Sequence, residues 1–319
     1  MKRIGIIGAG LIGRQHKNAI QKNPACCVGA ICDVVIEKAQ EFAVGTEANV
    51  YTDYREMERA EELDAVIINL PHFLHKEVAV YFLERKVAVL VEKPMANTVE
   101  ECDAMIAAAK LTATPLAVGH VQRYFEPYRK VRELIQTEEL GKLCLVTESR
   151  NGFYFHEKRP KWFLEKKKAG GGILMNFGAH SVDKLMYTTG ASVVDVAANG
   201  NNRLNDADIE ASAQVLLQLS NGVSASLSYS GCYAPAMEEV IFYFTKGCAK
   251  IIGLHQLWIS REGSEYQLED LGSPRVMLEA QLAEFVKLLD GEPSEVVGPE
   301  YGRDVVKVLN EAYSQIKCD

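Results

Sequence analysis

Short runs of aliphatic residues recur along the first third of the chain, separated by segments whose apolar positions follow a helical period. Aliphatic runs of this length are typical of strands covered on both faces, and their alternation with helices is typical of a doubly wound parallel sheet. The pattern predicts strands at residues 3–7, 28–32, 65–69, 87–91 and 116–118, and helices at residues 11–21, 36–43, 75–85 and 99–111.

The pattern changes after about residue 123. From residue 193 to about 268, apolar and polar residues alternate in short runs divided by turn signals, which predicts an antiparallel sheet with one buried face. Two amphipathic helices end the chain. We therefore expect an α/β protein: an N-terminal Rossmann domain over residues 1–122, with a doubly wound parallel sheet, and a C-terminal α+β domain over residues 123–319, with a large, mainly antiparallel open sheet. The last helices could pack back on the first domain.

Composition narrows the class of protein. A chain of 319 residues suits two domains, and a net charge of −8 argues against a broad nucleic-acid surface. No apolar run approaches the ~20 residues that a membrane helix requires, so we expect a cytoplasmic protein. The eight cysteines form no Cys-x-x-Cys pair and none lies near a histidine at zinc-like spacing, so we expect no metal site.

A glycine motif lies between the first predicted strand and the first predicted helix. Gly8, Gly10 and Gly13 form G-x-G-x-x-G, with Leu11 and Ile12 inside it. Such a turn allows the backbone to approach a pyrophosphate, and the helix N-terminus favours the phosphate charge. Because the motif lies between a strand and a helix, it predicts a dinucleotide site.

Asp33 ends the second predicted strand, twenty positions after Gly13. A carboxylate there can accept hydrogen bonds from the ribose hydroxyls of the adenosine half and would repel a 2′-phosphate. No arginine follows it, since the next residues are Val34 and Val35. The sequence favours NAD, and NADP stays open.

Two further motifs carry polar groups suited to catalysis. Lys93 follows the strand at 87–91, where ligands bind in open α/β sheets, and Pro94 restricts it to extended geometry and is a candidate for a cis bond. Asn176 and His180 lie four residues apart in a predicted helix that begins after three glycines, Gly170–Gly172. At this spacing the two side chains project from one face of the helix.

These motifs together resemble the glucose–fructose oxidoreductase/inositol dehydrogenase/rhizopine-catabolism (Gfo/Idh/MocA) family. The features that carry the resemblance are the glycine motif, the tripeptide Glu92-Lys93-Pro94, and the segments 69–75 (NLPHFLH), 119–124 (GHVQRY) and 170–180 (GGGILMNFGAH).

The resemblance implies an NAD(P)-dependent enzyme that transfers a hydride between nicotinamide and a secondary alcohol of a sugar, inositol or related polyol. It implies Lys93 and His180 as catalytic residues, and a homodimer or homotetramer formed through the C-terminal sheet. It also implies that Glu92 lies against the nicotinamide ribose, and the further candidates for cofactor binding are Asn69, Pro71, His75 and Lys93. His75 matches a family position, but a capping or packing role is equally open. Asn176 departs from the family, which usually has aspartate there; asparagine keeps the hydrogen-bonding shape but loses the charge that would favour a protonated lysine.

Three more residues are candidates for substrate contact beside Asn176 and His180. Arg123 and Tyr124 lie where the two predicted domains meet along the chain. Trp162 lies in a basic, aromatic loop, where it could stack on a sugar ring or anchor the loop. The lysines around Trp162 could bind a phosphorylated sugar or form a solvated loop. Two other functions stay open: a non-catalytic NAD(P)-binding sensor of the same fold, and an NAD-dependent glycosidase.

Overall fold

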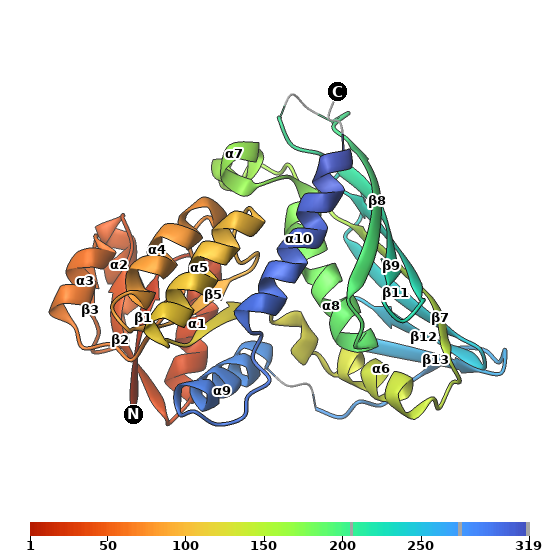
Figure 1. The fold of residues 1–319 in the computed structure, drawn as a ribbon, viewed down its shortest axis with the longest axis horizontal. Coiled ribbons are helices and arrows are strands. Elements are labelled where there is room, and N and C mark those ends of the chain that lie inside the picture. The colour runs from red at the N-terminus through yellow and green to blue at the C-terminus, as the bar shows by residue number, and fades with distance from the viewer. Residues whose placement is uncertain (205–206, 274–275, 317–319) are drawn as a thin grey trace. The chain divides into compact units, whose positions relative to one another are not determined.

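The computed structural model describes residues 1–204, 207–273 and 276–316 (Figure 1). The chain packs as two compact units. The first contains residues 1–121 and 276–304, and the second contains residues 122–275 and 305–319. The chain therefore returns to the first unit after completing most of the second. Cys318 lies outside the described residues.

The first unit is built on a six-stranded parallel sheet in the order β3-β2-β1-β4-β5-β6. The strands are β1 (Lys2–Ile7), β2 (Cys26–Cys32), β3 (Asn49–Tyr51), β4 (Ala65–Ile68), β5 (Ala88–Glu92) and β6 (Leu116–Gly119). The order reverses between β1 and β4, so the carboxyl ends of these strands border the crevice in which ligands of such sheets bind. The predicted doubly wound parallel sheet is confirmed.

Six α-helices lie wholly within this unit: α1 (Leu11–Lys22), α2 (Ile36–Ala43), α3 (Tyr54–Ala60), α4 (His75–Leu83), α5 (Val99–Thr112) and α9 (Met277–Leu289). Four of them were predicted within the first 120 residues, whereas β3 and α3 were not. β3 has only three residues, none of them fully buried, so it carries no aliphatic run. Asp53 caps α3 by accepting a hydrogen bond from the Arg55 N–H at 2.8 Å.

Helix α9 joins the core of the first unit although it comes late in the chain. Its apolar stripe, which includes Leu278, Leu282 and Phe285, is buried in the same cluster as Ile4 and Ile20. The stripe recurs every three or four residues, as in a helix that covers a sheet on one side.

The second unit contains an eight-stranded sheet in the order β14-β13-β12-β11-β7-β10-β9-β8. All neighbours are antiparallel except β7 and β10, which are parallel. The strands are β7 (Leu143–Asn151), β8 (Val193–Asn201), β9 (Ser212–Leu219), β10 (Ser224–Ser230), β11 (Met237–Phe244), β12 (Gly247–Ile252), β13 (Gln256–Arg261) and β14 (Gln267–Leu268). The predicted large, mainly antiparallel sheet is confirmed.

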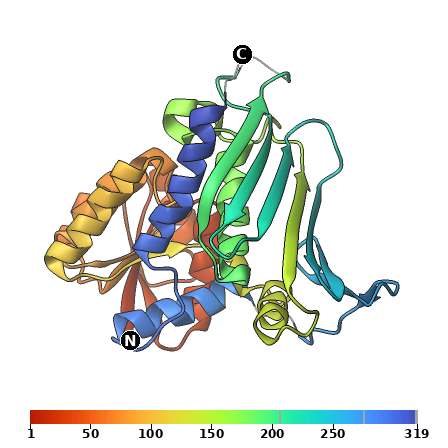
Figure 2. The same cartoon turned by 45° about the vertical axis from the view of Figure 1, so that its right-hand side comes forward.

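Helices cover one face of this sheet. They include α6 (Glu126–Thr137), α8 (Ala179–Thr189) and the C-terminal part of α10 (Pro299–Gln315), with the short α7 (Lys166–Ala169) ahead of the glycines. Both views show α8 running along the sheet (Figures 1 and 2). Along the described parts of the chain, none of the helices combines the length and the apolar character needed to cross a membrane.

Candidate active site

The glycine loop between β1 and α1 has the geometry of a phosphate-binding turn. Gly8 has φ +98°, and a Cβ there would lie 2.5 Å from the Asn69 carbonyl oxygen, so only glycine fits. A Cβ at Gly10 would meet nothing within 4 Å, and no side chain caps α1 at this residue. Gly13 is buried in the first turn of α1, while Leu11 is exposed and Ile12 is half-buried. The first N–H groups of α1 are therefore open to an anionic ligand.

Asp33 lies directly after β2 and is tied to this loop. Its Oδ2 accepts a hydrogen bond from the Ala9 N–H at 2.9 Å, and its Oδ1 accepts one from the Val35 N–H at 3.0 Å. Each carboxylate oxygen keeps a further lone pair for a ribose hydroxyl. The side chain is thus fixed next to the turn that would hold the pyrophosphate.

Asn69 follows β4 and lies against the same turn. Its Nδ2 donates to the Ile67 carbonyl at 3.4 Å, while its buried Oδ1 has no hydrogen-bond partner among the described residues. A buried acceptor without a partner is costly unless a ligand satisfies it. Leu70 and Pro71, both half-buried, continue this loop. The open glycine turn, the fixed carboxylate and the unsatisfied amide together fit a dinucleotide.

Glu92 and Lys93 lie at the carboxyl end of β5, and the Lys93–Pro94 bond is cis, as the sequence suggested. The Lys93 N–H donates to Glu92 Oε2 at 3.2 Å. Burial alone would raise the pKa of Glu92. The hydrogen bond and charge of His16, together with Lys93, outweigh burial and hold this pKa below its ordinary value. Glu92 is therefore an ionised carboxylate in a buried site.

His16 is a residue of this site that the sequence analysis did not identify. It lies on α1, three residues after Gly13, and its Nε2 is 2.8 Å from Glu92 Oε1. Both side chains are nearly inaccessible to solvent. The only signal in the sequence was a histidine one turn beyond the glycine motif, and its partner lies 76 residues away.

His75 begins α4 and is fully buried. Its Nδ1 is 3.0 Å from the Pro94 carbonyl oxygen, and its Nε2 is 2.8 Å from the Leu70 carbonyl oxygen. Burial lowers the pKa of His75, and the two carbonyls and the charge of Glu92 partly oppose this. The ring connects the loop after β4 to the loop after β5.

In the second unit, the segment with Asn176 and His180 begins with a π-helical turn (Leu174–Gly178) that continues directly into α8. The sequence predicted one regular helix here. Such π turns are rare and are frequent at functional sites. Asn176 lies inside the turn and His180 is the second residue of α8; both are half-buried.

Glu210 and Tyr313 fix the start of this segment, and the sequence analysis identified neither. Glu210 accepts from the Gly172 N–H at 2.9 Å and from the Leu174 N–H at 2.8 Å. The Tyr313 hydroxyl donates to Glu210 at 2.6 Å and accepts from the Gly172 and Met175 N–H groups. A Cβ at Gly172 would lie 2.2 Å from the Glu210 carbonyl oxygen, so this close packing requires glycine. Burial raises the pKa of Glu210.

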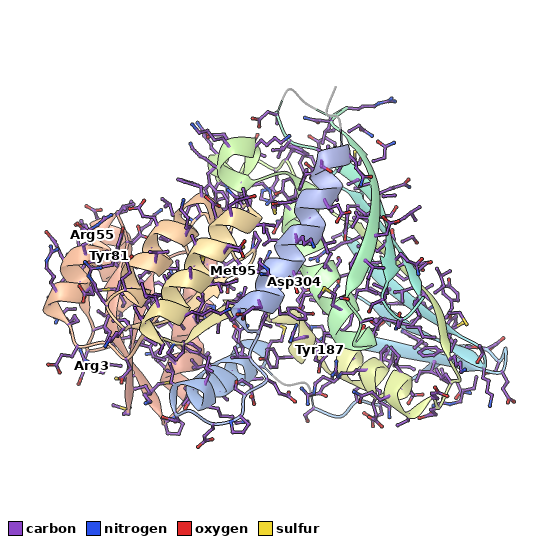
Figure 3. All side chains as sticks on the ribbon, in the orientation of Figure 1. Arg3, Arg55, Tyr81, Met95, Tyr187 and Asp304 are labelled. Atoms are coloured by element: carbon purple, nitrogen blue, oxygen red, sulfur yellow. The ribbon has the colours of Figure 1, made fainter. Side chains whose placement is uncertain are left out.

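Arg123 and Tyr124, predicted to contact substrate, are both buried in the second unit. The Arg123 guanidinium donates two hydrogen bonds to one Asp183 oxygen and lies 4.9 Å from the centre of the Tyr187 ring, which is labelled in Figure 3. Asp183 lies on α8, so Arg123 connects the segment after β6 to the helix that carries His180.

Trp162 lies in a short turn, where it is half-buried and stacks on Phe163 with ring centres 3.7 Å apart. The nearby Lys158, Lys161 and Lys167 are exposed. The structure thus keeps positive charge on this loop accessible to solvent.

Beneath α8, a group of buried charges joins the helix to the sheet. Lys184 lies 3.5 Å from Glu148 and is also paired with Glu238, which in turn binds Arg150 at 3.2 Å. Burial alone would lower the pKa of Lys184, but Glu148, Tyr128 and Glu238 together raise it. The ammonium therefore stays charged and fixes α8 on the sheet.

Two family models match this chain. The model described as "Oxidoreductase family, NAD-binding Rossmann fold" matches residues 2–120, and the model described as "GFO/IDH/MocA C-terminal domain" matches residues 128–250. The chain belongs to the Gfo/Idh/MocA oxidoreductase family. Both compact units are thus accounted for by one family, whose Rossmann fold binds NAD.

Relatives show how broad this family is. A 2,7-anhydro-N-acetylneuraminate hydratase of Mediterraneibacter gnavus is 26% identical over 79% of this chain and 68% of its own length. A glucose-6-phosphate 3-dehydrogenase of Bacillus subtilis is 28% identical over 74% of this chain and 69% of its own length. The crystal structure of a putative NADPH-dependent oxidoreductase from Desulfitobacterium hafniense has the same fold, with a TM-score of 0.91 at 20% identity, covering 98% of this chain and 95% of that one.

Proposed function

We propose that this protein transfers a hydride between NAD and a secondary alcohol of a sugar, inositol or related polyol. The observation that carries the proposal is the set of groups around Lys93. The lysine follows an ionised, buried carboxylate at the carboxyl end of β5, in a sheet whose glycine turn fits a dinucleotide. Nicotinamide, when bound, accepts or supplies the hydride.

The protein's part in the reaction is to orient the alcohol and move its proton. Lys93 is proposed to hydrogen-bond the alcohol oxygen and to stabilise the negative charge that develops there. His180 is proposed to take the hydroxyl proton in oxidation and to return it in reduction, since an ordinary histidine titrates near pH ~6.5. Asn176, one helical turn before His180, is proposed to donate or accept a hydrogen bond at the same substrate.

The other candidate residues are assigned to three roles: cofactor binding, substrate contact and positioning of α8. The residues proposed to hold the cofactor are Gly8, Gly10, Gly13, Asp33, Asn69 and Glu92. The side chains of Leu11, Ile12 and Pro71 are proposed to line the cofactor site. Trp162 is proposed to lie against the substrate. Arg123 already donates to Asp183, so we propose that it acts by positioning α8.

The first test is NADH production across polyols, inositols, free sugars and sugar phosphates, with NAD and NADP compared in parallel. Turnover on any of these, with NAD preferred, supports the proposal. A requirement for a phosphorylated substrate would assign the lysines around Trp162 to phosphate binding. If calorimetry shows NAD binding but no substrate is turned over, the proposed hydride transfer is contradicted.

The second test removes the lysine amine. Lys93→Ala should lower kcat by about 10²–10⁴-fold, the usual contribution of a positioned acid–base or oxyanion-binding group, and leave the Kd of NAD within a few-fold. Arg85→Ala is the control, because Arg85 follows α4 on the surface and packs on Tyr81. Unchanged turnover in Lys93→Ala would exclude the assigned chemistry.

A second candidate function is a cofactor-binding sensor without turnover. It is favoured by Asn176, where the family usually has aspartate. If the wild type binds NAD but is inactive on the whole panel, Asn176→Asp is the variant to assay, and activity gained by this one change would support the sensor.

A further inference from the structure

We propose that His16 and His75 are positioning residues that together fix the tripeptide Glu92-Lys93-Pro94 for catalysis. We call the two residues the histidine clamp. The inference rests on the proposed function, because it assigns a purpose to the geometry of Lys93. Neither histidine is proposed to touch the substrate.

The first half of the clamp acts on the Glu92 side chain. Glu92 Oε1 is 2.8 Å from the His16 ring, and Oε2 accepts from the Lys93 N–H at 3.2 Å. Gly119 on the neighbouring strand packs so closely that a Cβ there would lie 3.1 Å from Oε1. The carboxylate is thus held by His16, the Lys93 N–H and the close packing of Gly119. Its negative charge belongs to the residue that directly precedes Lys93 in the chain.

The second half acts on the backbone after Lys93. The His75 ring lies between the carbonyl oxygens of Pro94 and Leu70, at 3.0 and 2.8 Å. Both partners can only accept, and a neutral imidazole has one N–H, whereas an imidazolium can donate to both. The imidazolium therefore hydrogen-bonds both loops, whereas the neutral ring donates to one loop and only packs against the other. Met95, which follows Pro94 and is labelled in Figure 3, is itself fully buried.

Lys93 therefore lies between two residues that are each held by a buried histidine. His16 is on α1, directly after the glycine turn, and His75 is on α4, directly after the loop with Asn69 and Pro71. The clamp thus couples both proposed cofactor loops to the backbone of the catalytic lysine. A small displacement of such a group can cost about 10²-fold in rate, even when the altered residue is remote from the chemistry.

The activity test uses variants that either keep or remove the hydrogen bond. In His16→Gln the amide nitrogen can reach the position of the imidazole Nε2, while His16→Leu removes the donor. We expect His16→Leu to lower kcat roughly 10–100-fold and His16→Gln to restore most of it. His255→Leu is the control, because His255 is exposed and its ring packs on Phe125 in the second unit.

A double-mutant cycle separates positioning from a general loss of structure. If His16 acts through Lys93, His16→Leu has much less effect in the Lys93→Ala background than in the wild type. Equal factors in both backgrounds would overturn the clamp. If Lys93→Ala itself leaves turnover unchanged, the proposed function fails instead, so the two failures are distinguishable.

A third measurement needs neither cofactor nor substrate. Hydrogen exchange of the cofactor-free protein should show the peptide containing residues 92–96 exchanging about tenfold faster in His16→Leu and in His75→Leu, because its local structure opens more often. Exchange in α6, which belongs to the second unit, should stay as in the wild type. Unaltered exchange of residues 92–96 in both variants would overturn the clamp.

Discussion

Asp33 combines two contacts whose effects can be separated by substitution. Its carboxylate accepts two backbone hydrogen bonds, which shape the glycine turn, and it offers further lone pairs to a ribose. Hydrogen bonds to a charged group contribute about 1.5–3 kcal/mol each, which corresponds to roughly 10–150-fold in affinity. Asp33→Ala should therefore lower kcat/KM for NAD by about this factor and affect NADP much less, because the repulsion of a 2′-phosphate is also removed.

The measurement is kcat/KM with each cofactor, and Asp33→Asn is the informative companion. Asparagine keeps one oxygen for the Ala9 or Val35 N–H but carries no charge. An intermediate cofactor ratio in Asp33→Asn is expected. If the ratio of kcat/KM with NAD to kcat/KM with NADP is the same in the wild type, Asp33→Ala and Asp33→Asn, Asp33 serves only to tie β2 to the glycine turn.

At the scale of the element, the start of the helix that carries His180 depends on a tyrosine from the end of the chain. The Tyr313 hydroxyl makes three hydrogen bonds, so Tyr313→Phe leaves the Met175 N–H without its partner and weakens the contact of Gly172. A buried, unsatisfied N–H costs about 1–3 kcal/mol. We expect the unfolding free energy of Tyr313→Phe to decrease by about this amount and its kcat to fall, while the Kd of NAD stays unchanged.

Tyr51→Phe is a matched control for this prediction. Tyr51 also donates its hydroxyl to a glutamate, Glu61, at 2.8 Å, but it lies on β3 of the first unit. Denaturant unfolding measures the loss of stability in both variants, and steady-state kinetics measures the change in kcat. A loss of kcat in Tyr51→Phe as large as in Tyr313→Phe would show that the effect does not come from the helix start.

Glu210 adds a pH dependence to the same element. Because burial raises its pKa in the folded protein, the folded state retains the proton over a range above about pH 4.3 in which the unfolded chain has lost it. The unfolding free energy must then fall as pH rises from the unfolded pKa to the folded pKa. Glu210→Gln should remove this slope, which urea unfolding at a series of pH values would detect. A slope identical to that of the wild type would contradict the assignment.

These elements also show what the sequence could and could not predict. Helices such as α2 and α5 and the buried strands were predicted because each carries its own periodic pattern. β3 was not predicted, because its three residues are partly or fully exposed and form no aliphatic run. The π turn was not predicted, because a local change of helical pitch leaves no periodic pattern in the sequence. Within the site, the glycine motif and Glu92-Lys93-Pro94 are local in sequence. His16, Glu210 and Tyr313 were missed because their partners lie 76, 38 and 103 residues away.

At the scale of the whole molecule, we propose that the two compact units are also two units of stability. Phe285 on α9 and Phe242 on β11 are matched probes, because both are fully buried and each lies in a different unit. Replacing a buried phenylalanine by alanine costs about 3–5 kcal/mol through lost burial and the cavity left behind. Phe285→Ala should therefore destabilise the NAD-binding unit, and Phe242→Ala the other.

Binding of NAD distinguishes the two variants. A ligand that binds only the folded state stabilises it by about 2.7 kcal/mol at a hundred times its Kd. If the units unfold separately, saturating NAD should raise the Tm of the transition weakened in Phe285→Ala and leave the transition weakened in Phe242→Ala where it was. Differential scanning calorimetry with and without NAD measures both transitions in one experiment. A single transition that NAD shifts equally in both variants would mean that the chain unfolds as one cooperative unit. In that case residues 276–304 contribute to the stability of the whole protein rather than to that of the NAD-binding unit alone.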